Sequence, residues 1–460
     1  MNDAIETTRL TPVIDTMAAD LLTPLAVYLK LSEKSEHSFL LESVAGGTSL
    51  ARYSFIGADP VAVTMGGPES YGKLRQHFAV NTAEHRHDMP PFIGGAIGYL
   101  GFDACEWFEG SLAGGGDASD ACSFMFYRSI VAFDHARQVI KIVSLDREGE
   151  APAARERNAE IRRVLEDPTV PIPALNQPRP QVVLKSVSNW ERYDFEAAVA
   201  EIKELINAGE CYQAVLSQRF TRETSASPVA IYRALRSLNP SPYMFLLQFG
   251  KKSVVGASPE MLVRCDGNGL QYRPIAGTRP RGKTVDEDNA LADEMTCDKK
   301  EVAEHLMLVD LGRNDLGRVA KFGSVKVKSL MTVEKYSHVQ HLVSSLSAEL
   351  ADGKDRFDAF AACFPAGTVS GAPKVKAIEI IRGLEPTRRG VYAGAVGYFD
   401  YAGNMDTCIA IRTLVIEDGV ATIQAGAGIV ADSVPAAEFD ETVNKAKGLM
   451  RAIDIAEGRE

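Results

Sequence analysis

The sequence lacks a hydrophobic run long enough to cross a bilayer as a helix, which takes about 20 consecutive apolar residues. Its longest apolar run, residues 90–102, is too short and is interrupted by glycines. The opening residues, Met-Asn-Asp-Ala-Ile-Glu, lack the basic and apolar parts of a secretory signal. We therefore expect no membrane partner and a cytoplasmic location.

The sequence is also short of positive charge and of paired cysteines. Its 460 residues include 50 lysines and arginines against 61 aspartates and glutamates, which gives a net charge of −11. A nucleic-acid-binding surface needs a basic stripe, so we exclude nucleic acid as a partner, although a few buried arginines could still bind a small anion. The seven cysteines form no CxxC pair, which argues against a disulfide framework or a zinc cluster and favours free thiols.

A dense group of prolines divides the chain into two regions. Residues 150–166 have the charge pattern of an exposed helix, and five prolines follow within residues 168–180. That density prevents regular structure and is typical of a linker. We predict an N-terminal region over residues 1–167, a linker over 168–185 and a larger region over 186–460.

The larger region alternates helices and strands. Apolar residues at helical spacing predict a helix over residues 193–208, and Pro435 near a first turn predicts another over 435–453, capped by Asp432 or Ser433. Strands are expected over residues 211–220, 390–400, 405–416 and 420–428, and the last two form a hairpin. Strands clustered with helices, without strict βαβ alternation, predict an α+β fold.

Residues 277–284 match the phosphate-binding loop pattern G-x-x-x-x-G-K-[ST]. A true loop of this kind leads into a helix whose free N–H groups bind phosphate. Here three carboxylates follow at once, at residues 286–288, and would repel a triphosphate, while Pro280 removes one N–H. In such a site, residues 305–310 would form an apolar strand that ends in a magnesium-binding aspartate, but their apolar residues have helical rather than strand spacing. We keep a P-loop ATPase as a remote alternative and expect a surface loop.

Two segments each carry a pair of glutamates three residues apart, Glu301 with Glu304 and Glu438 with Glu441. On a helix this spacing places both carboxylates on one face. Each pair alone is typical of a solvated helix surface. Both pairs border apolar residues, however, and two such faces opposite each other would form an all-oxygen site suited to Mg²⁺.

Three glycine-rich turns next to polar residues could bind carboxylates through their backbone N–H groups, or could be tight turns and no more. They span residues 275–279, 364–374 and 424–429. Arg412 lies between apolar residues of an expected strand and needs an anionic partner if it is buried. Tyr392 and Lys445 are further candidates for a site, whereas a lone histidine such as His341 is more often structural than catalytic.

These motifs resemble those of the chorismate-utilising enzymes, and most closely those of the large subunits of anthranilate synthases. The resemblance is strong over residues 190–455 and extends to residues 40–43 and 52–57. The matching segments are Pro274-Ile-Ala-Gly-Thr-Arg279, Glu301 to Val319, His338 to Leu342, Phe364 to Lys374, Gly390 to Gly397, Ala425 to Ile429 and Glu438 to Thr442. The resemblance implies a β-sandwich core of largely antiparallel sheets flanked by helices. It also implies a catalytic site in the larger region and a regulatory N-terminal region packed on it.

The resemblance implies chorismate as the substrate and Mg²⁺ as the cofactor. In the family pattern the positions of Glu304 and Glu441 hold the metal, and those of Glu301 and Glu438 help directly or through water. Glu260 matches the general acid that protonates the leaving hydroxyl, a task that requires a raised pKa.

The same resemblance assigns the substrate-binding residues. Tyr392 and Arg412 match binders of the pyruvyl carboxylate, together with the backbone of residues 426–428, and Lys445 is expected near the ring carboxylate. Thr368 and His341 match residues near the ring and the enolpyruvyl side chain, where His341 is expected to assist pyruvate elimination. The full expected substrate-binding set is Ala276, Gly277, Thr278, Tyr392, Arg412, Gly426, Ala427, Gly428 and Lys445.

Two positions indicate which reaction follows. Relatives that add water carry a lysine base where this chain has Gln213, and a glutamine cannot take a proton from water. Relatives that form 4-amino-4-deoxychorismate carry a nucleophilic lysine where this chain has Ala276. We therefore expect amination at ring C2 with loss of the C4 hydroxyl, then loss of pyruvate to give anthranilate. The alternatives are a 2-amino-2-deoxyisochorismate synthase, an aminodeoxychorismate synthase and a non-catalytic regulatory homologue.

Two short segments resemble a tryptophan feedback site, which we favour over the alternative of a hairpin edge and a proline turn. They contribute Leu41, Glu42 and Ser43, and Pro242, Tyr243 and Met244. The resemblance implies inhibition by tryptophan through a shift between two conformations that bind it unequally. The sequence has no glutaminase motif, so ammonia is expected from solution or from a separate glutamine amidotransferase subunit.

Overall fold

The computed structural model describes residues 7–44, 52–114, 118, 121–147, 151–168, 185–336 and 339–459. The predicted linker lies outside these residues, apart from its two end positions. All seven cysteines lie in the described part and are free, and Cys297 alone among them is exposed. Within the described residues, no helix has the length and apolar character that a membrane span needs.

Thirteen strands form the larger of two sheets, called here the first sheet. In spatial order they are β10 (Val187–Ser188), β11 (Gln213–Glu223), β23 (Val420–Ile429), β22 (Thr413–Glu417), β13 (Lys252–Ser258), β12 (Tyr243–Phe249), β2 (His37–Glu42), β3 (Tyr53–Ala58), β8 (Ser129–Asp134), β9 (Val139–Arg147), β1 (Thr8–Ala18) and β5 (Asn81–Ala83), with β19 (Gly371–Ala372) paired to β11. Neighbouring strands run antiparallel, except that β1 and β5 are parallel.

Ten strands form the second sheet, and all its pairs are antiparallel. In spatial order they are β16 (Ile275–Pro280), β18 (Val339–Glu349), β15 (Gly269–Tyr272), β14 (Met261–Asp266), β21 (Met405–Ile409), β20 (Ala395–Asp400), β6 (Gly95–Leu100), β7 (Cys122–Tyr127) and β4 (Ala62–Gly66), with β17 (Lys326–Lys335) paired to β18.

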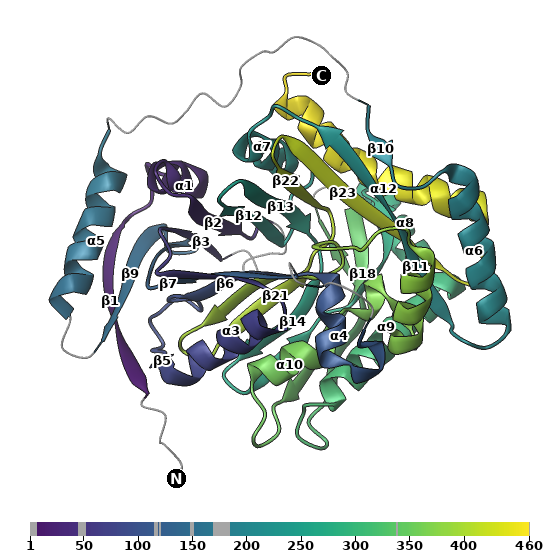
Figure 1. Ribbon diagram of the computed structural model, residues 1–460, viewed down its shortest axis with the longest axis horizontal. Helices are drawn as coiled ribbons and strands as arrows, with labels where there is room; N and C mark the ends of the chain where they lie inside the picture. Colours follow the sequence, from purple (N-terminus) through teal and green to yellow (C-terminus); the bar gives the residue numbers. More distant parts are fainter. Residues whose placement is uncertain are drawn as a thin grey trace.

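The described residues form eleven α-helices, which surround the strands (Figure 1). They are α1 (Pro24–Ser32), α3 (Pro68–Val80), α4 (Cys105–Phe108), α5 (Ala151–Glu166), α6 (Arg192–Asn207), α7 (Pro228–Leu238), α8 (Val285–Cys297), α9 (Lys299–Gly317), α10 (Arg356–Cys363), α11 (Lys374–Leu384) and α12 (Pro435–Ala456). Three short 3-10 turns are also present: η1 (Phe102–Ala104), η2 (Gly110–Leu112) and η3 (Gly367–Val369).

Strands from both sides of the expected linker share both sheets. In the first sheet β2 pairs with β12, so that Leu41 lies opposite Phe245. In the second sheet β6 pairs with β20, so that Gly98 lies opposite Gly397. The two predicted regions are therefore joined by continuous sheets, and the domain boundaries stay a prediction.

The two sheets pack face to face, and helices cover the outer face of the first sheet. Consecutive residues of β2 show this arrangement. The Phe39 ring points toward the second sheet, where its centroid lies 4.8 Å from that of Tyr127, whereas Leu40 belongs to the core cluster beneath α1, α7 and α12. Such alternation is expected of a strand that is buried on both faces, because successive side chains point to opposite sides.

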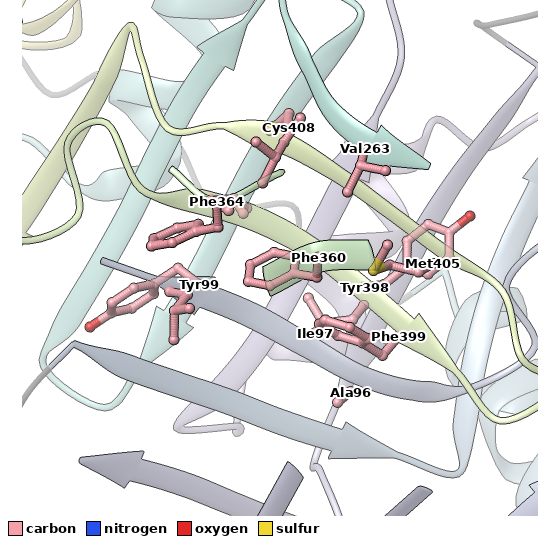
Figure 2. Packing of buried hydrophobic residues seen from close by; sticks show 14 of the residues in the cluster. Ala96, Ile97, Tyr99, Val263, Phe360, Phe364, Tyr398, Phe399, Met405 and Cys408 are labelled. Carbon is pink, nitrogen blue, oxygen red and sulfur yellow. The ribbon is translucent and has the colours of Figure 1, made fainter. Parts of the chain in front are cut away.

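The core between the sheets is rich in aromatic rings. The same cluster continues on the outer face of the second sheet. Figure 2 shows residues of β6, β14, β20 and β21 there and between the sheets, and Phe360 of α10 packs next to Phe399 on the outer face, whereas Tyr398 points toward Phe55 of the first sheet. Phe357, also on α10, stacks on Phe399 of β20 with ring centroids 4.8 Å apart. Truncating one such ring to alanine costs about 3–5 kcal/mol of stability. The predicted α+β class and antiparallel sandwich core are confirmed.

The prediction of one strand over residues 405–416 is wrong. β21 ends at Ile409 in the second sheet, and β22 begins at Thr413 in the first. Between them Arg412 has a φ of 50°, a left-handed conformation that is uncommon for a residue with a side chain. The apolar run hides this crossing in the sequence, because residues buried in either sheet look alike. The hairpin of β22 and β23 is confirmed.

Two more local predictions need correction. Residues 390–394 form turns that lead into β20 rather than part of a strand. The N-cap of α12 is Val434 and not Asp432 or Ser433. The Ser433 hydroxyl is engaged elsewhere, since it accepts the N–H of Val430 at 3.1 Å. The predicted helices over residues 150–166 and 193–208 are confirmed as α5 and α6.

Candidate active site

A cavity of about 710 Å³ is lined by β11 and β23 of the first sheet, β16 and β18 of the second sheet, and helices α9 and α12. The expected site residues that line it are Gln213, Glu260, Ala276, Gly277, Thr278, Glu304, His341, Thr368, Tyr392, Arg412, Gly426, Gly428, Glu438, Glu441 and Lys445. Two expected residues do not line it. Ala427 points into the core beneath α6 and α11, and Glu301 forms an ion pair with Arg279 at 3.0 Å.

Glu260 lies in the short turn between β13 and β14, where its backbone carbonyl accepts the N–H of Ile409 at 3.0 Å. The residue is 6% exposed, and burial raises the pKa of its carboxyl to about 8. The Thr368 hydroxyl and the Arg412 charge act in the opposite direction but do not cancel this effect. At neutral pH the carboxyl is therefore largely protonated and can donate a proton.

Three buried polar atoms in this cavity have no hydrogen-bond partner among the described residues. They are Gln213 Oε1, Glu260 Oε1 and Thr368 Oγ1. Buried polar atoms are nearly always paired in folded proteins, because leaving one unpaired costs about 1–3 kcal/mol. The Thr368 hydroxyl also lies near enough to Glu260 to act on the pKa of its carboxyl, so the three atoms together form a polar surface of the cavity that a polar ligand can bind.

Arg412 supplies a buried positive charge to the cavity. The crossing between the two sheets places it there, and its Nη1 donates to Asn239 Oδ1 at 3.4 Å. Burial lowers the pKa of the guanidinium and the nearby Glu260 acts to raise it. Within the described part of the chain it forms no ion pair with a carboxylate. A buried guanidinium of this kind is suited to bind a carboxylate ligand through its planar fork.

Glycines on β23 allow neighbouring side chains to approach its backbone. A Cβ at Gly426 would lie 2.8 Å from the Tyr392 hydroxyl oxygen, and one at Gly428 would lie 2.4 Å from Gln213 Nε2. Both distances are shorter than real Cβ contacts, so a side chain at either position would displace the end of the Tyr392 or Gln213 side chain. The side chains of Tyr392 and Gln213 therefore lie directly on the backbone of β23, at the edge of the cavity.

Carboxylates from two helices gather at another part of the cavity, Glu304 on α9 and Glu438 and Glu441 on α12. Burial raises the pKa of Glu304, and the charges of Glu301 and Glu441 add to this effect. Burial also raises the pKa of Glu438, with a further contribution from Glu441. The carboxylates thus repel one another across the two helices, and a cation between them would relieve that repulsion.

The donor chemistry of these carboxylates fits Mg²⁺, which prefers oxygen ligands and keeps several waters. As the side chains lie, however, no three acidic, histidine or cysteine residues in the described ranges are grouped closely enough to hold a metal ion. Two ion pairs account for this. Glu301 binds Arg279, and Glu441 binds Lys445 at 2.7 Å.

His341 on β18 has one ring nitrogen committed to the neighbouring strand. Its Nδ1 lies 3.1 Å from the Gly277 carbonyl oxygen and 3.0 Å from Thr278 Oγ1. Since a carbonyl can only accept, Nδ1 carries the proton and Nε2 has a free lone pair. Burial lowers the pKa of the imidazole, which favours this neutral form.

A second cavity, of about 330 Å³, is lined by all six residues of the expected tryptophan segments: Leu41, Glu42, Ser43, Pro242, Tyr243 and Met244. The two segments are neighbours because β2 pairs with β12, with Glu42 opposite Met244. Sequence reasoning missed several other residues here, including Arg52, Tyr53, Arg264, Tyr398 and Asp406. Arg52 directly precedes β3, and the others lie on β3, β14, β20 and β21, so that only the arrangement of the sheets brings them together.

The structure rules out the ATPase alternative. The loop before α8 uses its own carboxylates as partners: the Gly282 N–H donates to Asp288 Oδ1 at 2.9 Å, and the Lys283 N–H donates to Glu287 Oε2 at 2.8 Å. These are the N–H groups that would otherwise bind a phosphate. Residues 305–310, the supposed partner strand, lie within α9.

Tyr336 and Asn444 are among the cavity residues that were not expected from the sequence. Tyr336 lies at the end of β17, and its ring centroid is 5.6 Å from that of His341. Asn444 lies three residues after Glu441 on α12, so the helical spacing of the glutamates could have identified it. Nothing in the local sequence around Tyr336 indicates that it lines a cavity.

Comparisons with known proteins agree with this arrangement. Residues 36–451 match the family described as chorismate binding enzyme. The chain is 44% identical over 468 residues to anthranilate synthase component 1 of Pseudomonas putida, covering 95% of this chain and 94% of the relative. It is also 44% identical over 463 residues to the protein of that name from Thermus thermophilus, covering 98% and 99%. The crystal structure of anthranilate synthase component I from Streptococcus pneumoniae matches with a TM-score of 0.78 at 36% identity, covering 95% of this chain and 99% of that one. The chain therefore belongs to the family of chorismate-binding enzymes.

Proposed function

We propose that this chain is the chorismate-aminating subunit of an anthranilate synthase. It adds ammonia to ring C2 of chorismate with loss of the C4 hydroxyl, then eliminates pyruvate to leave anthranilate. The observation that carries the proposal is the buried, protonated Glu260 in the same cavity as the Arg412 guanidinium, which forms no ion pair with a carboxylate of the described residues. An acid for a leaving hydroxyl and a cation for a carboxylate are the two groups that chorismate requires.

Glu260 is the general acid of the proposal. Departure of the C4 hydroxyl as hydroxide is slow, and a proton from the carboxyl lets it leave as water. Glu260 Oε1, which has no partner in the described part of the chain, is available to the substrate. The nearby Thr368 hydroxyl, also without a described partner, orients the same part of the ring.

Arg412 binds the pyruvyl carboxylate, with the Tyr392 hydroxyl and the backbone of β23 around Gly426 and Gly428 as further donors. All four line one side of the cavity. Lys445 donates to the Gly426 carbonyl oxygen at 3.0 Å, which places its ammonium at the junction between this side and the carboxylates of α12. From there it can attract the second carboxylate of the substrate.

Gln213 and Ala276 favour ammonia over other nucleophiles. The Gln213 amide cannot remove a proton from water, but its unpartnered Oε1 can accept a hydrogen bond from ammonia. Ala276 lines the cavity without offering an amine for covalent attack. Direct addition of ammonia at ring C2 is the reaction that remains.

His341 acts in the second step of the proposal. Its neutral imidazole has Nδ1–H bound to the Gly277 carbonyl and Nε2 free to accept a proton. Loss of pyruvate requires removal of the proton at ring C2 as the bond from C3 to the enolpyruvyl oxygen breaks. A chain that lacked this base would stop at 2-amino-2-deoxyisochorismate.

Magnesium would be held by Glu304 and Glu441, with Glu301 and Glu438 helping directly or through water. When bound, the ion would hold the ring carboxylate and stabilise negative charge near it. The chain's own part is to bring these carboxylates together, which requires the Glu301–Arg279 and Glu441–Lys445 ion pairs to rearrange.

The second cavity is the proposed site for tryptophan as a feedback inhibitor. It combines aromatic rings with charges of both signs, including Glu42, Asp406 and Arg52, which suits a zwitterionic aromatic amino acid. Glu42 is held in place by Arg236, with Nε and Oε2 3.2 Å apart. Ammonia is proposed to come from a separate glutamine amidotransferase chain, since the relatives are named as one component of a synthase.

The proposal is tested by incubating the chain with chorismate, an ammonium salt and MgCl₂. We expect the fluorescence of anthranilate and an equal amount of pyruvate, measured with lactate dehydrogenase. An aminated product without pyruvate would identify the 2-amino-2-deoxyisochorismate synthase instead. A product that a 4-aminobenzoate-forming lyase converts would identify the aminodeoxychorismate synthase, and turnover that survives in Glu260→Gln would remove Glu260 from the mechanism.

A further inference from the structure

A buried ion pair lies directly behind the catalytic cavity without lining it. The Arg389 and Glu385 side chains are 1% and 4% exposed. Arg389 Nε donates to Glu385 Oε2 at 2.9 Å, and Nη2 donates to Oε1 at 2.6 Å, so the pair is bidentate. Apolar residues of similar volume often stabilise a core as well as a buried ion pair does. Stability alone therefore does not explain why the two charges are buried here.

Arg389 also binds two segments that line the cavity. Its Nη1 donates to the Val369 carbonyl oxygen at 2.7 Å, and its Nη2 donates to the Val215 carbonyl oxygen at 2.6 Å. Val369 directly follows Thr368 in η3, and Val215 lies on β11 close to Gln213. One guanidinium thus fixes the backbone beside two residues that the proposed reaction uses.

Tyr392 and β23 belong to the same network. The Arg389 guanidinium carbon lies 5.6 Å from the centroid of the Tyr392 ring. Glu385 Oε1 accepts the N–H and the hydroxyl of Ser217 at 2.8 and 2.7 Å, and that hydroxyl accepts from Gln424 Nε2 at 2.8 Å. Both Tyr392 and Gln424 line the cavity. Four separate segments of the cavity lining therefore meet at this one ion pair.

We infer that Arg389 is a positioning residue, which keeps β11, η3, Tyr392 and β23 in register around the enolpyruvyl side of bound chorismate. The inference rests on the proposed function for the identity of the substrate. The guanidinium of Arg389 uses donors on three nitrogens to bind one carboxylate bidentately and two carbonyl groups, whereas a lysine has only the three donors of one nitrogen and cannot reproduce these four bonds. Arg389 makes these bonds to β11, η3 and Glu385, and the carboxylates for Mg²⁺ lie on α9 and α12.

The test compares Arg389→Lys with a matched control, Arg222→Lys. Arg222 is also a buried arginine, 6% exposed against 3% for Arg389, and it lies on β11. It binds Asp454 and Glu457 at 2.6 and 3.2 Å, and it lines neither cavity. Both variants keep the charge, so each leaves a compensated ion pair. Thermal midpoints, kcat and KM for chorismate, and the Mg²⁺ concentration for half-maximal rate are measured for both.

We expect kcat/KM for chorismate to fall about 100-fold in Arg389→Lys, the effect of a misplacement of about 1 Å. The half-saturating Mg²⁺ concentration should stay at the wild-type value. Arg222→Lys should lose thermal stability to a similar extent and keep its kcat and KM. Equal kcat and KM in the two variants would overturn the inference. A loss of kcat/KM that is proportional to the loss of thermal stability in both variants would overturn it as well.

Two further measurements keep the inference open to refutation. If Arg389→Lys does not fold, Glu385→Gln takes its place, since the amide keeps one acceptor for the guanidinium and loses the second. Wild-type kinetics in a folded Glu385→Gln would then refute the positioning role. If the wild-type chain makes no anthranilate, the proposed function fails by itself. In that case, calorimetry measures the affinity of both variants for chorismate in the presence of Mg²⁺. Weaker binding to Arg389→Lys than to Arg222→Lys would support the positioning role, and equal binding would refute it.

Discussion

Arg412 and Asn239 are joined by a hydrogen bond of 3.4 Å, from Nη1 to Oδ1, and this contact links the two cavities of the molecule. Asn239 begins a short loop that ends at Pro242, and Pro242 lines both the catalytic cavity and the proposed tryptophan cavity. A ligand that moves this loop would therefore also move the hydrogen-bond partner of Arg412, the residue proposed to bind the substrate carboxylate. A coupling of this kind changes affinity at both sites by the same factor.

Removal of this link should weaken inhibition by tryptophan. In Asn239→Ala the inhibition constant should rise about fivefold, because a hydrogen bond of this type contributes about 1 kcal/mol. The inhibition constant is measured from initial rates at several tryptophan concentrations. The control is Ser225→Ala. Ser225 precedes the N-terminal end of α7, whereas the loop follows its C-terminal end, so this variant should keep wild-type inhibition. Unchanged inhibition in Asn239→Ala would show that the two cavities are coupled by another route.

The pH dependence of turnover should follow the protonation of Glu260. Its pKa of about 8 makes the carboxyl a proton donor below that pH, so kcat/KM should be constant there and fall about tenfold per pH unit above it. Rates are expressed per concentration of free ammonia, because ammonium itself titrates in the alkaline range. Glu260→Gln should lose at least about 100-fold in kcat. If the residual kcat/KM of Glu260→Gln still fell at alkaline pH, the group that titrates would be a residue other than Glu260.

The same raised pKa has a consequence for stability. The folded value of about 8 lies above the ordinary carboxyl value of 4.5, so the folded state binds the proton more tightly than the unfolded state. The stability contributed by this group is fully present below pH 4.5 and is lost as the pH rises to about 8. Glu260→Gln should therefore be more heat-stable than the wild type at about pH 9, with a smaller difference at about pH 5. Thermal unfolding at the two pH values measures this.

Withdrawal of the metal should stop the reaction and identify its ligands. Dialysis against EDTA should abolish turnover, and MgCl₂ should restore it. Glu304→Gln should raise the half-saturating Mg²⁺ concentration by more than roughly 10–100-fold, which is the loss seen when a residue that only hydrogen-bonds a metal ligand is removed. Glu379→Gln on α11, whose exposed carboxylate pairs with Lys376, is the matched control and should keep the wild-type value. Equal Mg²⁺ dependence in both variants would exclude Glu304 as a ligand.

A methyl group at Gly428 should disturb catalysis more than folding. Its Cβ would lie 2.4 Å from Gln213 Nε2, so the glutamine must move away from the position in which it is proposed to bind ammonia. We expect kcat/KM for ammonia to fall about 100-fold in Gly428→Ala. Gly383→Ala in α11, where a Cβ meets no atom within 4 Å, should keep full activity and gain about 0.5–1 kcal/mol of stability. A Gly428→Ala variant with normal ammonia kinetics would remove Gln213 from the proposed role.

Local patterns in the sequence predicted the elements that local interactions determine. The helix over residues 193–208 follows from apolar spacing, the helix over 435–453 from Pro435 in its first turn, and the hairpin near Gly419 from its turn residues. The paired glutamates pointed to helix faces, and three of the four, all except Glu301, line one cavity. These predictions need no knowledge of distant parts of the chain.

The remaining features depend on contacts between distant segments. Arg412 was expected within a strand, but it lies where the chain leaves one sheet for the other, and no periodicity marks such a crossing. Arg389 looks like one of several charged residues after a helix, and only the fold shows that it binds Val215 and Val369. Tyr398 reaches the second cavity through the pairing of β20 with β6, which joins residues about 300 positions apart.

The pairing of β6 with β20 also governs the order in which this chain can fold during synthesis. Gly95 of β6 lies opposite Asp400 of β20, so one edge of β6 has no partner until nearly the whole polypeptide has left the ribosome. The partner strand of β2 is β12, which is synthesised before β20 but also lies after the expected linker. Strand edges that stay unpaired during synthesis promote aggregation. We therefore expect the first 167 residues, expressed alone, to require a chaperone or to precipitate, and to be rescued by co-expression of residues 186–460.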